Sequence, residues 1–339
     1  MSISIDRRLS LKMAAASAAS MMLDSSEVFA AVEKPMMVNM VSTRGNATVT
    51  LEEAMREKGY LADVGVKYSL VNVADGAKLL GALLSGESDI CMFSGFSQVL
   101  VAIEKGAPIK ILAGALLKPE HAFYSGRPDI VSIADLKGKT VGTGSVGALL
   151  HEMTVAILLK KGVDINSVKF VNIGSAPDVF RAVAAKSVDA GIGEVDVYNE
   201  VAKYGVHVLK GGDLWRELPH FTFQASYAST AAITKKRDAL VRVLAAYARL
   251  YRFLEQPGSE KTYIAAQKKA LGRTDKKAAE TQWSFFAKNK IYATDLILSP
   301  ARVDYIQKLN VRLGVQKKIM PYDQVVDVSL AQEALKLIR

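Results

Sequence analysis

Segments with two different spacings of hydrophobic residues alternate along this chain. Short apolar runs of strand length predict β-strands at residues 36–41, 66–73, 89–93 and 109–116. Longer stretches with apolar residues three or four apart predict helices at 49–57, 77–84 and 96–105. The same order recurs with strands at 140–141, 168–173, 190–193 and 206–209 and helices at 148–161, 177–185 and 198–204. This alternation is typical of an α/β fold whose largely parallel sheets are covered by helices on both faces.

In the last third of the chain, hydrophobic residues recur only at helical spacing. From Lys236 on, the pattern predicts mainly amphipathic helices, which we expect to cover the first α/β unit with their apolar stripes. The clearest stripe consists of Leu240, Val243, Leu244, Tyr247, Tyr251 and Leu254.

A glycine-rich run, Gly-Thr-Gly-Ser-Val-Gly, occupies residues 142–147 between a predicted strand and a predicted helix. In a dinucleotide-binding fold, an acid about 20 residues further on ends the next strand and binds the ribose. Asp164 stands at that distance but precedes the next strand, which ends in Gly174-Ser175. We therefore expect no nicotinamide, flavin or other cofactor. A glycine-rich turn that opens a helix still leaves backbone N–H groups free for an anionic or polar ligand group.

Several phrases between about residue 36 and residue 232 carry a family resemblance. They are ALLSGESDICMFSG, AIEKGAPIKILAGA, IVSIADLKGKTVGTGS, VKFVNIGSAPDVFRAV and AKSVDAGIGEVD. In order and spacing they resemble the solute-binding proteins of ABC importers in the nitrate, sulfonate, taurine and thiamine-pyrimidine (NMT1-like) group. The resemblance implies a two-lobed, type II periplasmic-binding fold with a C-terminal helical segment, in which hinge closure captures a small molecule. It also implies a monomer whose partner is an inner-membrane ABC permease.

Two segments are predicted to cross between the lobes. Residues 121–127 would lead out, and residues 221–230, with alternating apolar and polar positions, would return as a half-buried extended strand. We therefore expect residues 31–120 and 228–339 in the first lobe and residues 121–227 in the second.

Ligands of open α/β sheets bind where the carboxyl ends of strands lead into helices. Four loops of this kind supply the candidate ligand-binding residues, which are Ser42, Thr43, Arg44, Asn46, Ser94, Gly95, Phe96, Ser97, Gly144, Ser145, Val146, Gly147, Glu194 and Asp196. Each also has a purely structural interpretation. The three serines of the first two loops could cap helices, Phe96 could belong to the core, and Asp196 could cap the helix that follows it.

The charges of these loops leave the ligand class open. An inward-facing Arg44 would bind a carboxylate or sulfonate through two hydrogen bonds, whereas an outward-facing one would be an ordinary surface charge. We expect a small organic anion, such as a sulfonate, a carboxylate or a nitrate-like ion. Glu194 and Asp196 favour the alternative, an uncharged or cationic pyrimidine or thiamine precursor. Taurine-type relatives often carry an acid in a Trp-Asp-Pro context, and this chain lacks both the tryptophan and the proline.

The sequence offers little for catalysis. Its four histidines have no metal-type spacing, and Cys91, the only cysteine, lies in an apolar run where a packed side chain is expected. The related fungal thiamine-pyrimidine synthases use a cysteine-rich motif and a cofactor-bearing lysine, and that motif is absent. A transcription regulator with this architecture would need an N-terminal helix-turn-helix. We expect a binding protein and no metal site.

The N-terminus carries an export pattern instead. Arg7 and Arg8, followed by Leu11 and Lys12, match the twin-arginine signal, and small residues before Ala31 offer a cleavage site near Ala30. We expect a periplasmic protein. No later stretch approaches the roughly 20 apolar residues that a membrane-spanning helix needs.

The net charge of +10 does not come from residues of the predicted cleft. Residues 231–339 contain 21 Lys and Arg against 10 Asp and Glu, so the basic excess lies in the C-terminal segment. We interpret it as a solvated helix face, or as a surface attracted to an anionic membrane or a partner. The chain shows no nucleic-acid-binding motif, and we expect no nucleic-acid partner.

The export signal is testable by replacing Arg7 and Arg8 with lysine. Because the twin-arginine pathway reads that pair, we expect the precursor to accumulate in the cytoplasm, measured by fractionation and immunoblotting. An unchanged periplasmic yield would contradict the twin-arginine assignment and leave a general secretory route.

Overall fold

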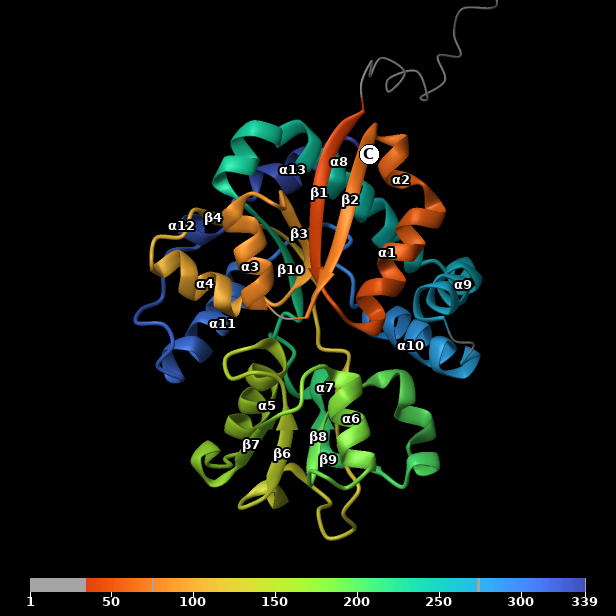
Figure 1. The fold of residues 1–339 in the computed structure, drawn as a ribbon, viewed down its shortest axis with the longest axis vertical. Helices are drawn as coiled ribbons and strands as arrows, with labels where there is room; N and C mark the ends of the chain where they lie inside the picture. Colours follow the sequence, from red (N-terminus) through yellow and green to blue (C-terminus); the bar gives the residue numbers. More distant parts are fainter. Residues whose placement is uncertain (1–34, 75, 273–274, 339) are drawn as a thin grey trace, which may run out of the picture. The chain divides into compact units, whose positions relative to one another are not determined.

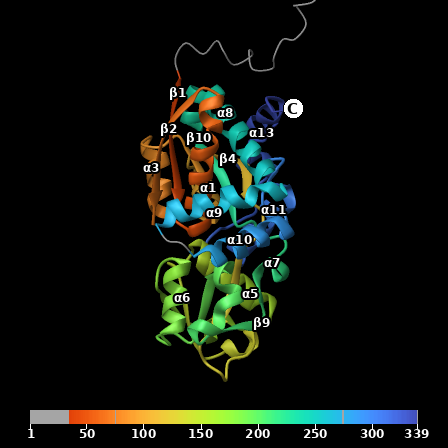
Figure 2. The same cartoon turned by 90° about the vertical axis from the view of Figure 1, so that its right-hand side faces the viewer.

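The computed structural model describes residues 35–74, 76–272 and 275–338. The expected export signal and its cleavage site near Ala30 lie outside the described residues. From residue 36 on, two five-stranded sheets organise the chain, with helices packed around both (Figures 1 and 2). The expected α/β fold with a C-terminal helical segment is confirmed.

Two strands of the first sheet begin and end at the residues predicted from the sequence. These are β2 (Val66–Val73) and β4 (Ile109–Leu116). The other members are β1 (Met36–Thr43), β3 (Ile90–Ser94) and β10 (Gln224–Ser229), in the order β2-β1-β3-β10-β4. β1 is parallel to β2 and β3, whereas β10 is antiparallel to both of its neighbours. This sheet and its helices form the first lobe.

The second sheet repeats that arrangement. Its order is β7-β6-β8-β5-β9, and its bounds are Lys169–Asn172 for β7, Thr140–Thr143 for β6, Ala190–Glu194 for β8, His121–Ser125 for β5 and His207–Asp213 for β9. β6 is parallel to β7 and β8, and β5 is antiparallel to β8 and β9. This sheet and its helices form the second lobe.

The predicted crossings differ from the observed ones. Residues 121–127, expected to cross, instead begin with β5, a buried strand held between two others, so the outward crossing is confined to residues 117–120. The return crossing covers residues 218–223, and the expected boundary at residue 227 falls inside β10. β10 is buried along its whole length rather than half-buried, because its place between β3 and β4 covers it on both edges and both faces.

Local sequence signals fix the helices of the two lobes. α6 begins at a reciprocal cap between Ser175 and Asp178, with Pro177 in its first turn, and α1 ends at Gly59, whose φ of 69° suits glycine. The first-lobe helices are α1 (Asn46–Lys58), α2 (Tyr60–Asp63), α3 (Gly76–Ser85) and α4 (Ser97–Glu104). The second-lobe helices are η2 (Ile133–Leu136), α5 (Leu149–Lys160), η3 (Ile165–Ser167), α6 (Ala176–Ala184), η4 (Val195–Tyr204) and α7 (Leu214–Glu217).

The C-terminal segment is helical as expected. Its elements are α8 (Thr230–Leu254), η5 (Pro257–Ser259), α9 (Glu260–Leu271), α10 (Lys276–Asn289), α11 (Pro300–Arg312), α12 (Tyr322–Val325) and α13 (Ser329–Lys336). The stripe predicted on α8 is core, since none of its six residues is more than 1% exposed. One expectation is incomplete. α10 packs against η4 of the second lobe as well as against α9, and Lys277 Nζ lies 2.9 Å from Glu200 Oε1.

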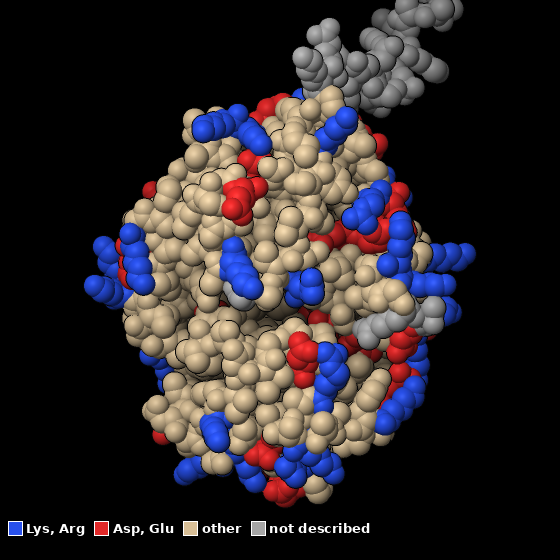
Figure 3. Space-filling view, viewed as in Figure 1, with Lys and Arg blue, Asp and Glu red and all other residues tan. Residues whose placement is uncertain are grey.

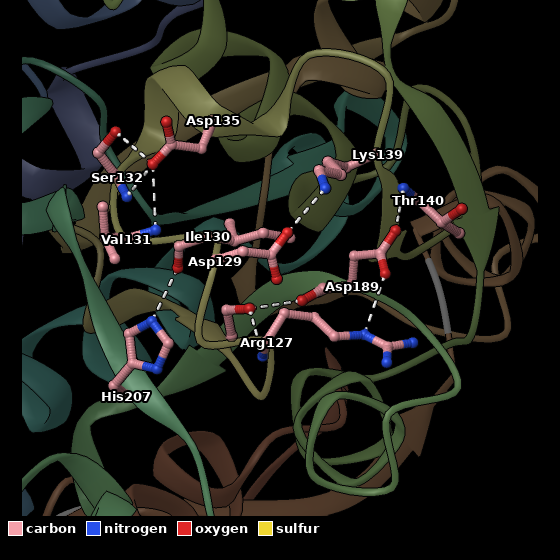
Figure 4. Close-up of polar contacts among 11 residues, drawn as sticks. Arg127, Asp129, Ile130, Val131, Ser132, Asp135, Lys139, Thr140, Asp189 and His207 are labelled. Atoms are coloured by element: carbon pink, nitrogen blue, oxygen red, sulfur yellow. Dashed lines mark hydrogen bonds and ion pairs between the residues drawn. The ribbon is translucent and has the colours of Figure 1, made fainter.

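In each sheet, one aspartate at the start of the central strand accepts a hydrogen bond from the backbone of a neighbouring strand. Asp89 precedes β3, and its carboxylate accepts hydrogen bonds from the backbone N–H of Asn39 at 2.8 Å and from Lys236 Nζ at 2.7 Å. Asp189 precedes β8 in the same way and accepts from the N–H of Thr140 at 2.8 Å and from Arg127 Nε at 3.2 Å (Figure 4). The two lobes therefore share a detail that the sequence pattern alone did not reveal as a repeat.

We expect Asp89→Ala and Asp189→Ala each to lower the free energy of unfolding by about 1–3 kcal/mol, because each change leaves a strand N–H without its acceptor. Urea unfolding followed by circular dichroism measures the effect.

Asp129→Ala is the matched control. Its carboxylate pairs with Lys139 at 3.2 Å but is 66% exposed, so its removal should leave the urea unfolding curve unchanged (Figure 4). Equal losses in all three variants would contradict the role assigned to the two aspartates.

Candidate functional site

A cavity of about 520 Å³ opens between the carboxyl ends of the parallel strands of the two lobes. The hollow is visible in Figure 3, where charged side chains of both signs flank it. Nine of the predicted residues line it. From the first lobe these are Thr43, Arg44, Ser94, Gly95 and Ser97, and from the second lobe Gly144, Ser145, Gly147 and Glu194. The cavity volume suits a small organic molecule.

The other predicted residues do not line the cavity. Ser42 and Phe96 are buried below it, with Phe96 in the hydrophobic core, and Val146 points into solvent with 77% of its surface exposed. Asn46 and Asp196 do not line the cavity, and their side chains contact each other.

Several of the capping roles considered for these residues are wrong. Gly45 precedes α1 and Phe96 precedes α4, so neither Ser42, Ser94 nor Ser97 is an N-cap residue. Asp196 does not cap the helix after it, because η4 starts one residue earlier, at Val195. These side chains are therefore available for tertiary contacts.

The glycine-rich loop is less open to a ligand than its sequence indicated. Gly147 has a φ of 76°, and its N–H donates to Nδ1 of His151 at 3.2 Å. The N–H of Ala148 donates to the carbonyl of Ser145 at 2.9 Å. Two of the amides expected to bind a ligand are thus engaged within the loop.

Direct contacts between the lobes flank the cavity. The backbone N–H of Asn46 donates to Glu194 Oε1 at 3.3 Å, and its Nδ2 donates to Asp196 Oδ2 at 3.3 Å. Elsewhere, Gly95 meets Leu149 so closely that a Cβ at Gly95 would lie 3.0 Å from Leu149 Cδ1. The absent side chain at Gly95 therefore lets the two lobes approach.

The residue-type pattern missed five buried polar residues that line the cavity, namely Thr48 on α1, Glu120, His121, Glu152 and Gln224. Glu120 lies in the outward crossing, the next two lie on β5 and α5, and Gln224 opens β10. These residues become part of a site only through tertiary contact. For Glu152, a charged residue inside a largely apolar segment was the available signal.

Burial determines the charge of these groups. It raises the pKa of Glu152 to about 8, against a smaller opposing effect of a hydrogen bond with Ser97. Burial, and then the nearby Glu194, raises the pKa of Glu120 well above its ordinary value. Burial lowers the pKa of His121 to about 3. Burial therefore favours the neutral forms of Glu120, Glu152 and His121.

Arg44 stands at the rim of the cavity. Its side chain is exposed and makes no hydrogen bond or ion pair with any described residue. No other Lys or Arg within the described chain lines the cavity. The guanidinium is thus free to bind an anionic group.

Metal-ligand clusters and membrane-spanning helices are both absent from the described residues. Among them, no His, Cys, Asp and Glu residues form a group of three or more that could hold a metal ion. Among the described residues, no helix has the length and apolar character needed to cross a bilayer.

Comparison with known proteins gives several binding proteins. YtlA of Bacillus subtilis (strain 168), provisionally named as a binding protein, is 24% identical over 293 residues, covering 81% of this chain and 83% of YtlA. The alkanesulfonate-binding protein SsuA from Xanthomonas axonopodis pv. citri, solved with MOPS, has a TM-score of 0.69 at 18% identity, covering 88% of this chain and 98% of SsuA. The nitrate-binding protein NrtA from Synechocystis PCC 6803 has a TM-score of 0.71 at 14% identity, covering 90% of this chain and 89% of NrtA.

The fold also occurs in an enzyme. The desulfurization enzyme DszB has a TM-score of 0.63 at 14% identity, covering 89% of this chain and 100% of DszB. Structural likeness at this identity therefore establishes the periplasmic-binding fold, but not an activity. The sequence pattern of one family matches residues 53–258, more than half of the chain. The protein therefore belongs to the NMT1/THI5-like family.

Proposed function

We propose that this protein is the periplasmic solute-binding component of an ABC importer and captures a small organic anion between its lobes. The family match and the fold support the binding role. The observation that carries the ligand class is the unpartnered guanidinium of Arg44 at the rim of a 520 Å³ cavity. A sulfonate, a carboxylate or a nitrate-like ion would accept two hydrogen bonds from it.

The acidic residues of the cavity do not oppose an anion as strongly as their number indicates. Burial raises the pKa values of Glu120 and Glu152 and so favours their neutral forms. Asp178 caps α6 and pairs with Arg181, and the hydrogen bond from Ser175 and then the charge of Arg181 lower its pKa. Of the two acids that favoured a cationic ligand in the sequence, Asp196 does not line the cavity, and Glu194 accepts a hydrogen bond from the backbone of Asn46.

Capture would proceed by hinge closure. Both crossings, residues 117–120 and 218–223, lie at the cavity end of the sheets, so rotation about them changes the distance between the lobes. A ligand that contacts both lobes stabilises the closed form by its differential affinity for that form. We propose that an inner-membrane permease recognises this form and that the protein acts as a monomer without a cofactor.

A binding role fits the cavity better than catalysis. Cys91 is fully buried in β3 and does not line the cavity, and burial raises the pKa of its thiol. His121 lines the cavity but has a pKa of about 3, far below the value that suits a general base near pH 7. We therefore propose that the likeness to DszB extends to the fold alone.

Arg44 provides the direct test. Isothermal titration of the mature protein with MOPS, ethanesulfonate, benzoate, nitrate and 4-aminopyrimidine identifies the preferred class. For an anionic ligand, Arg44→Ala should weaken binding by about 1.5–3 kcal/mol, the range for a hydrogen bond to a charged group. Arg44→Lys should recover only part of this loss, because lysine lacks the two-point geometry.

Arg312→Ala is the matched control, since Arg312 is also exposed but lies on α11 away from the cavity. The Arg312→Ala variant should bind the preferred ligand with the affinity of the wild type. Binding of 4-aminopyrimidine alone, or equal affinities of the Arg44 and Arg312 variants, would refute the anion assignment.

A further inference from the structure

Arg302 contacts both crossings between the lobes with one side chain. It lies in the first turn of α11, and its Nη1 donates to the carbonyl of Leu117 in the outward crossing at 2.7 Å. The same nitrogen donates to the carbonyl of Pro219 in the return crossing at 3.3 Å. Because Nη1 carries two hydrogens, it can donate one to each carbonyl. The two crossings are thus joined through a single atom.

The contact with Leu117 lies within the first lobe. The N–H of Leu117 donates to the carbonyl of Ile291 at 2.7 Å, which fixes this end of the outward crossing to the segment before α11. α11 itself packs against α4 of the first lobe. A rotation of the second lobe therefore leaves the distance between Arg302 and Leu117 unchanged.

The contact with Pro219 spans the hinge. The N–H of Leu218 donates to the carbonyl of Leu214 on α7 at 2.8 Å, which ties the chain just before Pro219 to the second lobe. Further along, the N–H of Phe223 donates to the carbonyl of Leu116 in β4 at 3.0 Å and so belongs to the first lobe. The pivot of the return crossing therefore lies between Pro219 and Phe223. A rotation that moves Pro219 away breaks its bond with the guanidinium, because hydrogen bonds weaken steeply beyond their normal length and angle.

Local preferences disfavour an arginine at position 302. The N-terminus of a helix is the positive end of its dipole, so a cation in the first turn of α11 lowers the stability of that helix. The side chain is partly buried, and burial lowers its pKa because the charge loses contact with water. Arg302 makes no ion pair with any described residue. A residue that breaks such rules needs a compensating gain, and the two crossing carbonyls provide it.

The described form has its lobes in direct contact. Asn46 of the first lobe donates to Glu194 of the second, and Gly95 lies against Leu149. Both contacts flank the cavity, so this arrangement is the closed one in which a ligand would meet both lobes. The bond between Arg302 and Pro219 belongs to the same arrangement and stabilises it.

We propose that Arg302 is a positioning residue of the hinge, which links Leu117 to Pro219, stabilises the closed arrangement and thereby raises the affinity for a ligand that it does not touch. Arg302 does not line the cavity. The inference rests on the hinge closure of the proposed function and adds the residue that sets how often the closed form occurs without ligand. The apparent dissociation constant equals the intrinsic one divided by the closed fraction, so a change at Arg302 should alter both by one factor.

The experiment measures the closed fraction and the affinity in the same protein. Single-molecule FRET between dyes on Lys105→Cys in the first lobe and Lys169→Cys in the second reports the distance between the lobes without ligand, and both positions are exposed. Cys91 is buried and does not compete for the dyes. Isothermal titration of the labelled mature protein with MOPS, ethanesulfonate, benzoate and nitrate measures the affinity.

Arg302→Ala should lower the ratio of closed to open molecules about five- to tenfold, the effect of one lost hydrogen bond across the hinge. The dissociation constant of the bound anion should rise by the factor by which the closed fraction falls. Arg302→Lys keeps a positive charge on a shorter side chain without the guanidinium fork, so both effects should be smaller. If the alanine variant unfolds, the lysine variant provides the same comparison.

Arg252→Ala is the matched control. Arg252 on α8 is also an arginine whose guanidinium donates to two backbone carbonyls, those of Thr294 at 3.2 Å and Ile338 at 3.4 Å. All three residues belong to the first lobe, because the segment around Thr294 pairs with β4 and α13 packs on α8. The Arg252→Ala variant should therefore keep the closed fraction and the affinity of the wild type.

The outcomes separate this inference from the proposed function. An unchanged or higher closed fraction in Arg302→Ala overturns the inference, as does a ligand-free wild type that is entirely open, and anion binding by the wild type would then leave the proposed function standing. Weaker binding with an unchanged closed fraction also overturns the inference, because the loss would not come from the hinge. If the wild type binds none of the four anions, the anion assignment fails, and the ligand-free FRET comparison still decides the role of Arg302.

Discussion

The carboxyl ends of the parallel strands of both sheets face one cavity, and the positions of the polar loops follow from that orientation. β10 and β5 enter their sheets antiparallel, so both crossings between the lobes also lie at this end. Hinge, cavity and interlobe contacts therefore coincide. The opposite ends of the sheets carry Asp89 and Asp189, and each of these aspartates holds adjacent strands together through a hydrogen bond to a strand N–H.

Much of this arrangement was predictable from the spacing of hydrophobic residues along the chain. β2 and β4 are eight-residue strands with strong apolar character, and their bounds were predicted without error. β5 was missed as a strand because its five residues begin with a histidine and end with a serine, and only its pairing with β8 and β9 makes it one. The burial of β10 depended on strand order, which local periodicity does not contain.

The site was predictable only where it lies on loops. Strand-end loops gave nine residues that line the cavity, because the architecture itself directs such loops inward. Glu152 and Gln224 could not be found in this way, since a polar residue on a buried helix or strand looks like a surface position until its neighbours are known. Glu120 accepts a hydrogen bond from Gln282, 162 positions further along the chain, and no sequence pattern connects the two.

The C-terminal helices connect this chemistry to the motion of the hinge. Gln282 on α10 donates to Glu120 in the outward crossing at 2.7 Å, and Tyr263 and Gln267 on α9 both donate to Gln282. α10 also contacts η4 of the second lobe through Lys277 and Glu200. A rotation about the crossings must therefore preserve or exchange these contacts, and α10 restricts the directions in which the lobes separate. Burial raises the pKa of Glu120 and so favours its neutral form, which lets its bond with Gln282 hold the hinge with little negative charge beside the ligand. Among the described residues Arg44 is the one cationic side chain that lines the cavity, and a ligand meets it together with the carboxyl groups of Asp178 and Glu194.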